Sequence, residues 1–221
     1  MWSNITGQER VIKILKNIYL SNKISHAYIF YGKEGIGKDA VAIEFAKLIN
    51  CENRIDVIDA CDRCTSCRQI SSLNSTSFKF ITALPSGRKE NSEEDNPVNT
   101  LKQEDYEIYL EEIEKKSKDH YHKINIQNAN DIRISSIRQI RKEIYLTGIK
   151  GKKKIFLISN SDLMNLQSSN AFLKILEEPP GDSLIILTTS RLNSMLSTIT
   201  GRCQKIRFDP IKKEDLAKFL L

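Results

Sequence analysis

The sequence predicts an α/β fold in which helices lie on both faces of a five-stranded parallel sheet. Apolar segments with the character of buried strands recur at 27–31, 78–84, 154–158, 184–189 and 205–208. Helical patterns separate these segments, and strands that alternate with helices form parallel sheets covered on both faces. A glycine-rich loop at 32–39 follows the first strand and precedes a helix at 40–49, which is the context of a phosphate-binding loop.

The composition is that of one α/β domain with an added segment. The chain has 221 residues, enough for a substantial core. It contains no apolar run of about 18 residues and no basic-then-apolar start, so we expect a soluble, cytoplasmic protein without membrane contact. The formal net charge of +6 permits contact with nucleic acid but does not establish it.

The remaining helices bound a base domain, predicted at 1–208. Apolar residues recur at helical spacing within 4–22 and again within 132–146. Asn165 is expected to cap a helix that runs to Glu178, where two prolines end it. Residues 209–221 are interpreted as the start of a helical lid domain, which the end of the chain cuts short.

Residues 86–122 differ sharply in composition, being rich in charged and polar side chains. We interpret them as an insertion that lays one amphipathic helix on the domain. The segment 100–103, Thr-Leu-Lys-Gln, has a capping-box pattern, and one apolar face follows, made by Tyr106, Tyr109, Leu110 and Ile113. We interpret His120 and His122, at the end of the insertion, as surface residues rather than metal ligands.

The phosphate loop carries one residue that does not suit an ATPase. In such loops glycines let backbone N–H groups wrap the phosphates, a lysine reaches the terminal oxygens, and a Ser or Thr hydroxyl holds Mg²⁺. Here Lys38 is present, but Asp39 replaces the hydroxyl and brings a negative charge to the phosphate position. The simplest alternative is a plain strand-to-helix turn, in which Asp39 is favoured by the helix dipole.

The second metal-binding element lacks its acids as well. An active ATPase ends this buried strand in an acid that anchors Mg²⁺, whereas Ser159 and Asn160 follow the segment 154–158 here. Asp162, further along, is interpreted as a turn or helix-start residue. Because each lost electrostatic contact costs orders of magnitude in rate, we expect no efficient ATP hydrolysis. Binding of a nucleotide or anion by the loop backbone stays open.

Four of the five cysteines form a pattern typical of a zinc site. Cys51 is followed by Cys61, Cys64 and Cys67, so that two overlapping Cys-x-x-Cys pairs share one short segment. Four thiolates supply the tetrahedral ligand set of a structural zinc ion. Disulfides are the alternative that a reducing cytoplasm disfavours, and a redox pair is a second alternative. Cys203 is interpreted as a small buried residue.

Taken in order, the motifs resemble the clamp-loader branch of the AAA+ family, the bacterial DNA polymerase III subunits. The resemblance spans about residues 4–221 apart from the insertion. Besides the phosphate loop and the cysteines, it rests on Ile5-Thr6-Gly7-Gln8, Ser25-His26-Ala27-Tyr28, Ser136-Ile137-Arg138, the run Asn-Ala-Phe-Leu-Lys-Ile-Leu-Glu-Glu-Pro-Pro at 170–180, Thr188-Thr189 and Thr200-Gly201-Arg202-Cys203.

Within this branch, the losses at Asp39, Ser159 and Asn160 are typical of the delta prime type rather than of the gamma and tau motors. The resemblance implies a nonhydrolysing member of a five-subunit ring that loads the sliding clamp onto primed DNA. Its partners would be gamma/tau and delta subunits, the clamp and the DNA. The chain would belong to the DNA polymerase III holoenzyme, a DNA-directed DNA polymerase (a nucleotidyltransferase), without ATPase activity of its own. Without the collar that supplies most ring contacts, we expect a monomer.

The resemblance also assigns roles to individual residues. Arg202 would be an arginine finger that acts on the nucleotide of a neighbouring motor subunit, although Gly201 replaces the family's usual Ser before it. The alternative for Arg202 is an ion pair on its own surface. The degenerate nucleotide-binding set would comprise Gly32, Gly35, Gly37, Lys38, Asp39, Ser159, Asn160 and Thr189, the last as the family's sensor threonine.

Two other functional classes remain open. In a gamma/tau-type motor, Asp39 would replace the hydroxyl as a metal ligand, and turnover of Mg·ATP would reveal it. In a DNA-binding module, the basic cluster at 150–154 would be the working surface, and salt-dependent binding to primed DNA would support it. We interpret that cluster instead as a solvated turn that feeds a buried strand.

Overall fold

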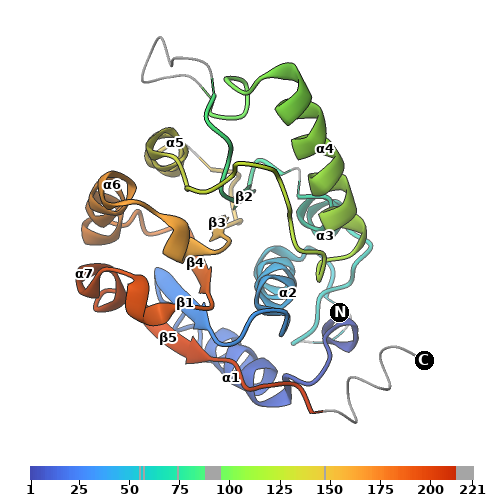
Figure 1. Cartoon of the computed structure of the whole chain (residues 1–221). Helices are drawn as coiled ribbons and strands as arrows, with labels where there is room; N and C mark the ends of the chain where they lie inside the picture. Colours follow the sequence, from blue (N-terminus) through green and yellow to red (C-terminus); the bar gives the residue numbers. More distant parts are fainter. Residues whose placement is uncertain (55, 57, 74, 88–95, 147, 213–221) are drawn as a thin grey trace.

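The computed structural model is a parallel sheet with helices on both faces (Figure 1). It describes residues 1–54, 56, 58–73, 75–87, 96–146 and 148–212. The five strands are hydrogen-bonded in the order β2-β3-β4-β1-β5 and all neighbours run parallel. Their bounds are β1 Ala27–Tyr31, β2 Phe78–Ile81, β3 Lys154–Ile158, β4 Ser183–Thr189 and β5 Gln204–Arg207. The predicted fold class is confirmed.

Seven α-helices and three short 3-10 helices are found in the described residues. The α-helices are α1 Glu9–Leu20, α2 Lys38–Asn50, α3 Thr65–Ser71, α4 Gln103–Lys118, α5 Ile134–Ile144, α6 Leu166–Glu177 and α7 Ser197–Thr200. The 3-10 helices are η1 Trp2–Asn4, η2 Ser161–Leu163 and η3 Leu192–Ser194. None of the helices in the described part of the chain is long and apolar enough to cross a lipid bilayer.

The sheet separates two apolar cores. Alternate side chains of the strands point to opposite faces, so Tyr28 and Phe30 pack towards α1 and α2, whereas Ala27 and Ile29 pack towards α5, α6 and α7. The central strand β4 is buried at all of its positions, as its uninterrupted apolar and threonine sequence requires. Helix α4 lies outside α2 and α3, on the same side of the sheet (Figure 1).

The predicted boundaries have different outcomes. Asn165 caps α6, because its side-chain oxygen accepts a 2.9 Å hydrogen bond from the backbone N–H of Ser168. The strand expected at 78–84 ends at Ile81, and Leu84 instead forms an isolated antiparallel bridge with Asp131. The predicted lid extends beyond Lys212, outside the described residues, so that boundary stays a prediction.

The insertion does contain the expected helix, but two details of the prediction were wrong. Lys102 is the N-cap of α4, without a side-chain cap, and the Thr100 hydroxyl donates backwards to the Pro97 carbonyl at 2.9 Å, so no capping box forms. The most buried side chains of α4 are Glu112 and Lys116, whereas Leu110 is exposed. Tyr106, Tyr109 and Ile113 of the predicted apolar face are half-buried, so the helix packs through charged groups as well as apolar ones.

Candidate functional site

The main candidate site lies where three parallel strands end. In open α/β sheets, ligands bind beyond the carboxyl ends of the strands, where loops from neighbouring strands diverge. The phosphate loop leaves β1 at this edge, Ser159 follows β3, and Thr188 lies near the end of β4. Together with the end of the insertion they enclose a pocket of about 270 Å³, lined by Glu34, Gly35, Gly37, Lys38, Asp39, Lys116, His120, Tyr121, His122, Lys123, Ile124, Ser159, Asn160 and Thr188.

The phosphate loop has the expected backbone shape, with its lysine folded inward. Gly35 and Gly37 adopt left-handed φ values of 77° and 84°, which glycine accepts without strain. The Lys38 ammonium donates to the carbonyl oxygens of Gly32 and Lys33 at 3.1 and 2.6 Å. Burial lowers the pKa of Lys38. The Lys38 ammonium is therefore already bound by carbonyl oxygens of the loop itself.

Asp39 is fully engaged by the elements around it. Its Oδ1 accepts from the Thr188 hydroxyl at 2.7 Å, and its Oδ2 accepts from the Ser159 hydroxyl at 2.7 Å. The Lys116 ammonium lies 3.1 Å from the same Oδ2. Burial alone would raise the pKa of Asp39, but the Lys116 charge and the hydroxyl hydrogen bonds from Thr188 and Ser159 outweigh it and lower that pKa. Asp39 is thus a carboxylate with an internal counter-ion.

The structure brings most of the predicted nucleotide-site residues together, with two exceptions. Gly35, Gly37, Lys38, Asp39, Ser159 and Asn160 all line the pocket, whereas Gly32 and Thr189 do not. The Thr189 hydroxyl donates instead to Asp162 at 2.6 Å, and Arg191 pairs with the same carboxylate at 2.8 Å. Asp162 lies in η2, directly after β3, as a turn residue should. Thr188 is the threonine that faces the pocket.

Sequence reasoning did not find the residues that the insertion and the segment directly after it contribute. Lys116, Tyr121 and Lys123 reach the pocket from α4 and the segment after it. His120 and His122 line it too, each half-buried, with His120 bonded to the Ser71 carbonyl. The apolar face predicted for this helix does not include Lys116, and nothing in a charged segment marks such a side chain as buried, so the sequence could not reveal this contact.

The four predicted cysteines form a second candidate site, a metal centre. The sulfur atoms of Cys51, Cys61, Cys64 and Cys67 all lie within 4.8 Å of one another, and each of the four residues is at most 8% exposed. Tetrahedral zinc with Zn–S bonds of about 2.3 Å would need sulfurs about 4 Å apart. The residues present therefore fit a metal ion such as zinc.

Backbone N–H groups point at the sulfurs as they do in metal-binding knuckles. Cys61 N–H donates to Cys51 Sγ at 3.3 Å, Cys64 N–H to Cys61 Sγ at 3.2 Å, and Cys67 N–H to Cys64 Sγ at 3.4 Å. Such outer hydrogen bonds stabilise thiolate charge and fix ligand direction. Asp62, inside the first Cys-x-x-Cys pair, adopts a left-handed φ of 54°.

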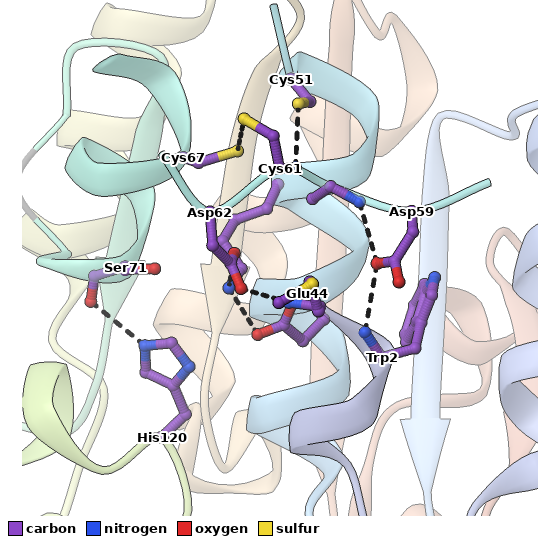
Figure 2. Close-up of polar contacts among 12 residues, drawn as sticks. Trp2, Glu44, Cys51, Asp59, Cys61, Asp62, Cys67, Ser71 and His120 are labelled. Carbon is purple, nitrogen blue, oxygen red and sulfur yellow. Dashed lines mark hydrogen bonds and ion pairs between the residues drawn. The ribbon is translucent and has the colours of Figure 1, made fainter. Parts of the chain in front are cut away.

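An ion-pair cluster ties this module to the helix of the phosphate loop (Figure 2). The buried Lys47 ammonium contacts Glu44 at 2.5 Å and Asp62 at 2.7 Å. The terminal ammonium of Met1 pairs with Glu44 at 2.8 Å, and the Trp2 backbone N–H donates to Asp59. Helix α2 thus starts at the phosphate loop and ends directly before the first cysteine of the metal centre.

Arg202 lies on the surface between α7 and β5. Its side chain is 41% exposed, and its guanidinium pairs with Glu177 at 3.0 Å and donates to the Thr198 carbonyl at 3.1 Å. An exposed pair of this kind contributes at most about 1 kcal/mol, so a stronger anion could displace Glu177. The role of Arg202 remains a prediction.

Three lysines of the basic cluster are occupied by acceptors of the chain itself. Lys152 pairs with Glu52 at 2.6 Å, Lys153 donates to the Gly181 carbonyl, and Lys154 donates to the Glu143 carbonyl at 2.7 Å. These contacts fix the turn that leads into β3. They favour the structural interpretation of the cluster.

Comparison with known proteins decides the family. The family model described as "DNA polymerase III, delta subunit" matches residues 7–212. The chain belongs to this family. The polymerase III gamma subunit of Buchnera aphidicola (Schizaphis graminum) is 29% identical over 99% of this chain and 48% of its own length. The delta prime subunit of Bacillus subtilis is 27% identical over 97% of this chain and 51% of its own length. The chain spans about half the length of these relatives.

Solved structures show the AAA+ fold as well. An arginine-to-alanine variant of Thermotoga maritima RuvB superposes with a TM-score of 0.50 at 12% sequence identity. The match covers 98% of the present chain and 50% of the RuvB chain. At that identity the likeness concerns the fold alone. Relatives of both gamma and delta prime type match this delta-family chain at similar identity, so the site residues must distinguish between them.

Proposed function

We propose that this chain is a delta prime-type subunit of the DNA polymerase III clamp loader. It serves as a nonhydrolysing stator of the ring that loads the sliding clamp onto primed DNA, beside gamma/tau and delta subunits. The observation that carries the proposal is the state of Asp39. Both of its oxygens are engaged by Thr188, Ser159 and Lys116, so a metal ion would have to compete with these partners for the carboxylate.

The same observation weighs against the gamma/tau-type motor. A motor subunit would need Asp39 to replace the missing hydroxyl as a magnesium ligand, yet the Lys116 ammonium group already contacts this carboxylate. Ser159 and Asn160 supply no acid in place of the usual pair after β3. A steady-state assay with Mg·ATP separates the two readings. Turnover at the rate of ordinary AAA+ motors, abolished by Lys38→Ala, would support the motor.

Arg202 is the catalytic residue we assign to this subunit, acting in trans. A guanidinium at a neighbour's nucleotide stabilises charge on the transferred γ-phosphoryl group, and such fingers are worth roughly 10³–10⁵ in rate. The Glu177 pair holds Arg202 at the surface of the isolated chain without burying it. Lysine would replace it poorly, because lysine lacks the planar fork that engages two oxygens.

The experiment places Arg202→Ala in a full-length version of this subunit within a reconstituted loader. DNA- and clamp-stimulated ATP hydrolysis should fall, while ring assembly and metal content remain intact. Lys205→Ala, an exposed cation on the adjacent strand, is the matched control and should leave hydrolysis unchanged. Unchanged hydrolysis and loading with Arg202→Ala would remove Arg202 from the mechanism.

The metal centre has a structural role in this proposal. We propose that one zinc ion is held by Cys51, Cys61, Cys64 and Cys67, a closed set that leaves no position for substrate. The ion would fix the segment between α2 and β2. Direct contact of the basic turn with DNA has less support, since Lys152 and Lys154 already have acceptors within the chain.

A further inference from the structure

Residues of the insertion and of the segment directly after it line the pocket at the phosphate loop. The segment concerned runs from 112 to 125, comprising the second half of α4 and the residues after it, and we call it the cover. Three of its side chains, Lys116, Tyr121 and Lys123, contact the loop region from different directions.

Lys116 lies beside Asp39, the residue that replaces the magnesium-binding hydroxyl of the motif. Its ammonium is 3.1 Å from Asp39 Oδ2 and donates to the His122 carbonyl at 2.8 Å, and its side chain is only 4% exposed. Mg²⁺ requires several oxygen ligands in near-ideal octahedral geometry. Asp39 Oδ2 already has Ser159 and Lys116 as partners, and the ammonium would repel a divalent cation, so a metal ion would have to displace Lys116 to coordinate this oxygen.

Tyr121 covers the part of the loop that would cradle the phosphates. A Cβ atom placed on Gly37 would come within 2.7 Å of the Tyr121 ring, so ring and loop backbone are in direct contact. The Tyr121 hydroxyl in turn accepts a 2.9 Å hydrogen bond from the Thr6 backbone N–H. Lys123 forms an ion pair with Glu34 of the loop.

The cover is held in this position by buried contacts of its own. Glu112, which is buried, accepts from the Asn125 backbone N–H at 2.8 Å and from His122 Nε2 at 2.9 Å. The cover therefore forms a closed turn around one carboxylate. The cover is therefore fixed by hydrogen bonds to Glu112 within itself, and it contacts the loop region through the ion pairs of Lys116 and Lys123.

We infer that the insertion closes the phosphate-loop pocket from within the chain, with Lys116 taking the place of the metal ion and Tyr121 lying over the loop. The subunit therefore keeps its nucleotide site shut by an intramolecular occupant. This assigns a function to the insertion itself and goes beyond the proposed stator role. It concerns nucleotide binding, whereas the stator role concerns turnover and clamp loading.

The test measures Mg·ATP binding by equilibrium dialysis on the whole chain and four variants. Asp39→Thr restores the hydroxyl of the motif but leaves Lys116 in place. Asp39→Thr/Lys116→Met removes both charges together, so that neither remains buried without a partner, and a triple variant adds Tyr121→Ala. Asp39→Thr/Lys118→Met is the matched control, because Lys118 lies on the same helix and is 73% exposed.

We expect no saturable binding to the unmodified chain and little gain in Asp39→Thr or in the control. The triple variant should bind Mg·ATP at least about tenfold more tightly than Asp39→Thr. The inference is overturned if the unmodified chain binds with a Kd below about 100 µM, or if Asp39→Thr alone binds as well as the triple variant. A folded triple variant without any gain would overturn it too.

A second measurement needs no variant. Amide hydrogen exchange of residues 32–39 and 112–125 in the unmodified chain should be unchanged by addition of Mg·ATP at about 5 mM, well above the Kd values of ordinary nucleotide sites. Increased protection of either segment would show that nucleotide enters and would overturn the inference. A chain that binds Mg·ATP without hydrolysing it would leave the proposed stator function standing.

Discussion

Replacement of Glu112 by glutamine should lower the free energy of unfolding of the chain in a pH-dependent way. Glu112 accepts from the Asn125 backbone N–H, from His122 and from Lys115 at 2.8, 2.9 and 3.1 Å. Burial alone would raise the pKa of this carboxyl, but these hydrogen bonds and the neighbouring cations lower it from 4.5 to about 2. Glutamine keeps the shape of the side chain and removes the charge.

The magnitude follows from the shift in the Glu112 pKa. A change from 4.5 to about 2 is about 2.5 units, and at about 1.4 kcal/mol per unit the charged form contributes up to about 3 kcal/mol. Because the folded-state pKa is depressed, this contribution is complete above the unfolded pKa of about 4.5. It is lost as the pH falls from about 4.5 towards 2, and about 1 kcal/mol remains at pH 3.

Urea unfolding followed by circular dichroism provides the assay. The difference in free energy of unfolding between the unmodified chain and Glu112→Gln should be largest at pH 7 and shrink towards pH 3. Acid also releases metal from cysteine ligands, but that loss affects both proteins, so the difference isolates Glu112. Glu114→Gln, on the exposed face of the same helix, should show almost no difference. A Glu112→Gln difference that stays constant with pH would refute the reasoning.

Three further predictions concern other parts of the fold. Chain purified without chelator should contain one equivalent of zinc, and Cys67→Ser should lower both metal content and the midpoint of thermal unfolding; metal analysis well below one equivalent, or a native disulfide, would contradict the zinc assignment. Asn165→Ala should cost about 1 kcal/mol of stability in urea unfolding because α6 loses its cap, whereas Asn165→Asp should cost little. Gly37→Ala should destabilise the chain by more than about 1 kcal/mol, since φ is 84° and the new Cβ would meet Tyr121, and Gly181→Ala, in open space, serves as the control.

The sheet could be predicted because its signals are local. The strands are short apolar runs, and the loop between β1 and α2 carries glycines at the positions where left-handed backbone is needed. The cysteines likewise come together because two tight turns bring three of them into one segment. For these features the chain needs few distant contacts to define the result.

The charged packing of the insertion could not be predicted in this way. Glu112 and Lys116 are four residues apart on a helix, a spacing that usually indicates a solvent-exposed pair. What buries Lys116 is Asp39, far away in the sequence, and no pattern within the insertion records that partner. The choice of Thr188 over Thr189 as the pocket residue depends similarly on which face of β4 each side chain occupies, and a fully buried strand does not reveal this.

Helix α2 connects the metal centre mechanically to the phosphate loop. The helix has 13 residues, so it is about 20 Å long, with the phosphate loop at one end and Cys51 at the other. Tetrahedral sulfur ligation would clamp the far end of this rod, while the pair between Lys47 and Asp62 braces its last turn. In the proposed ring, force from a neighbouring subunit would then be transmitted along α2, and loss of the metal would make the Cys51 end of the helix more compliant.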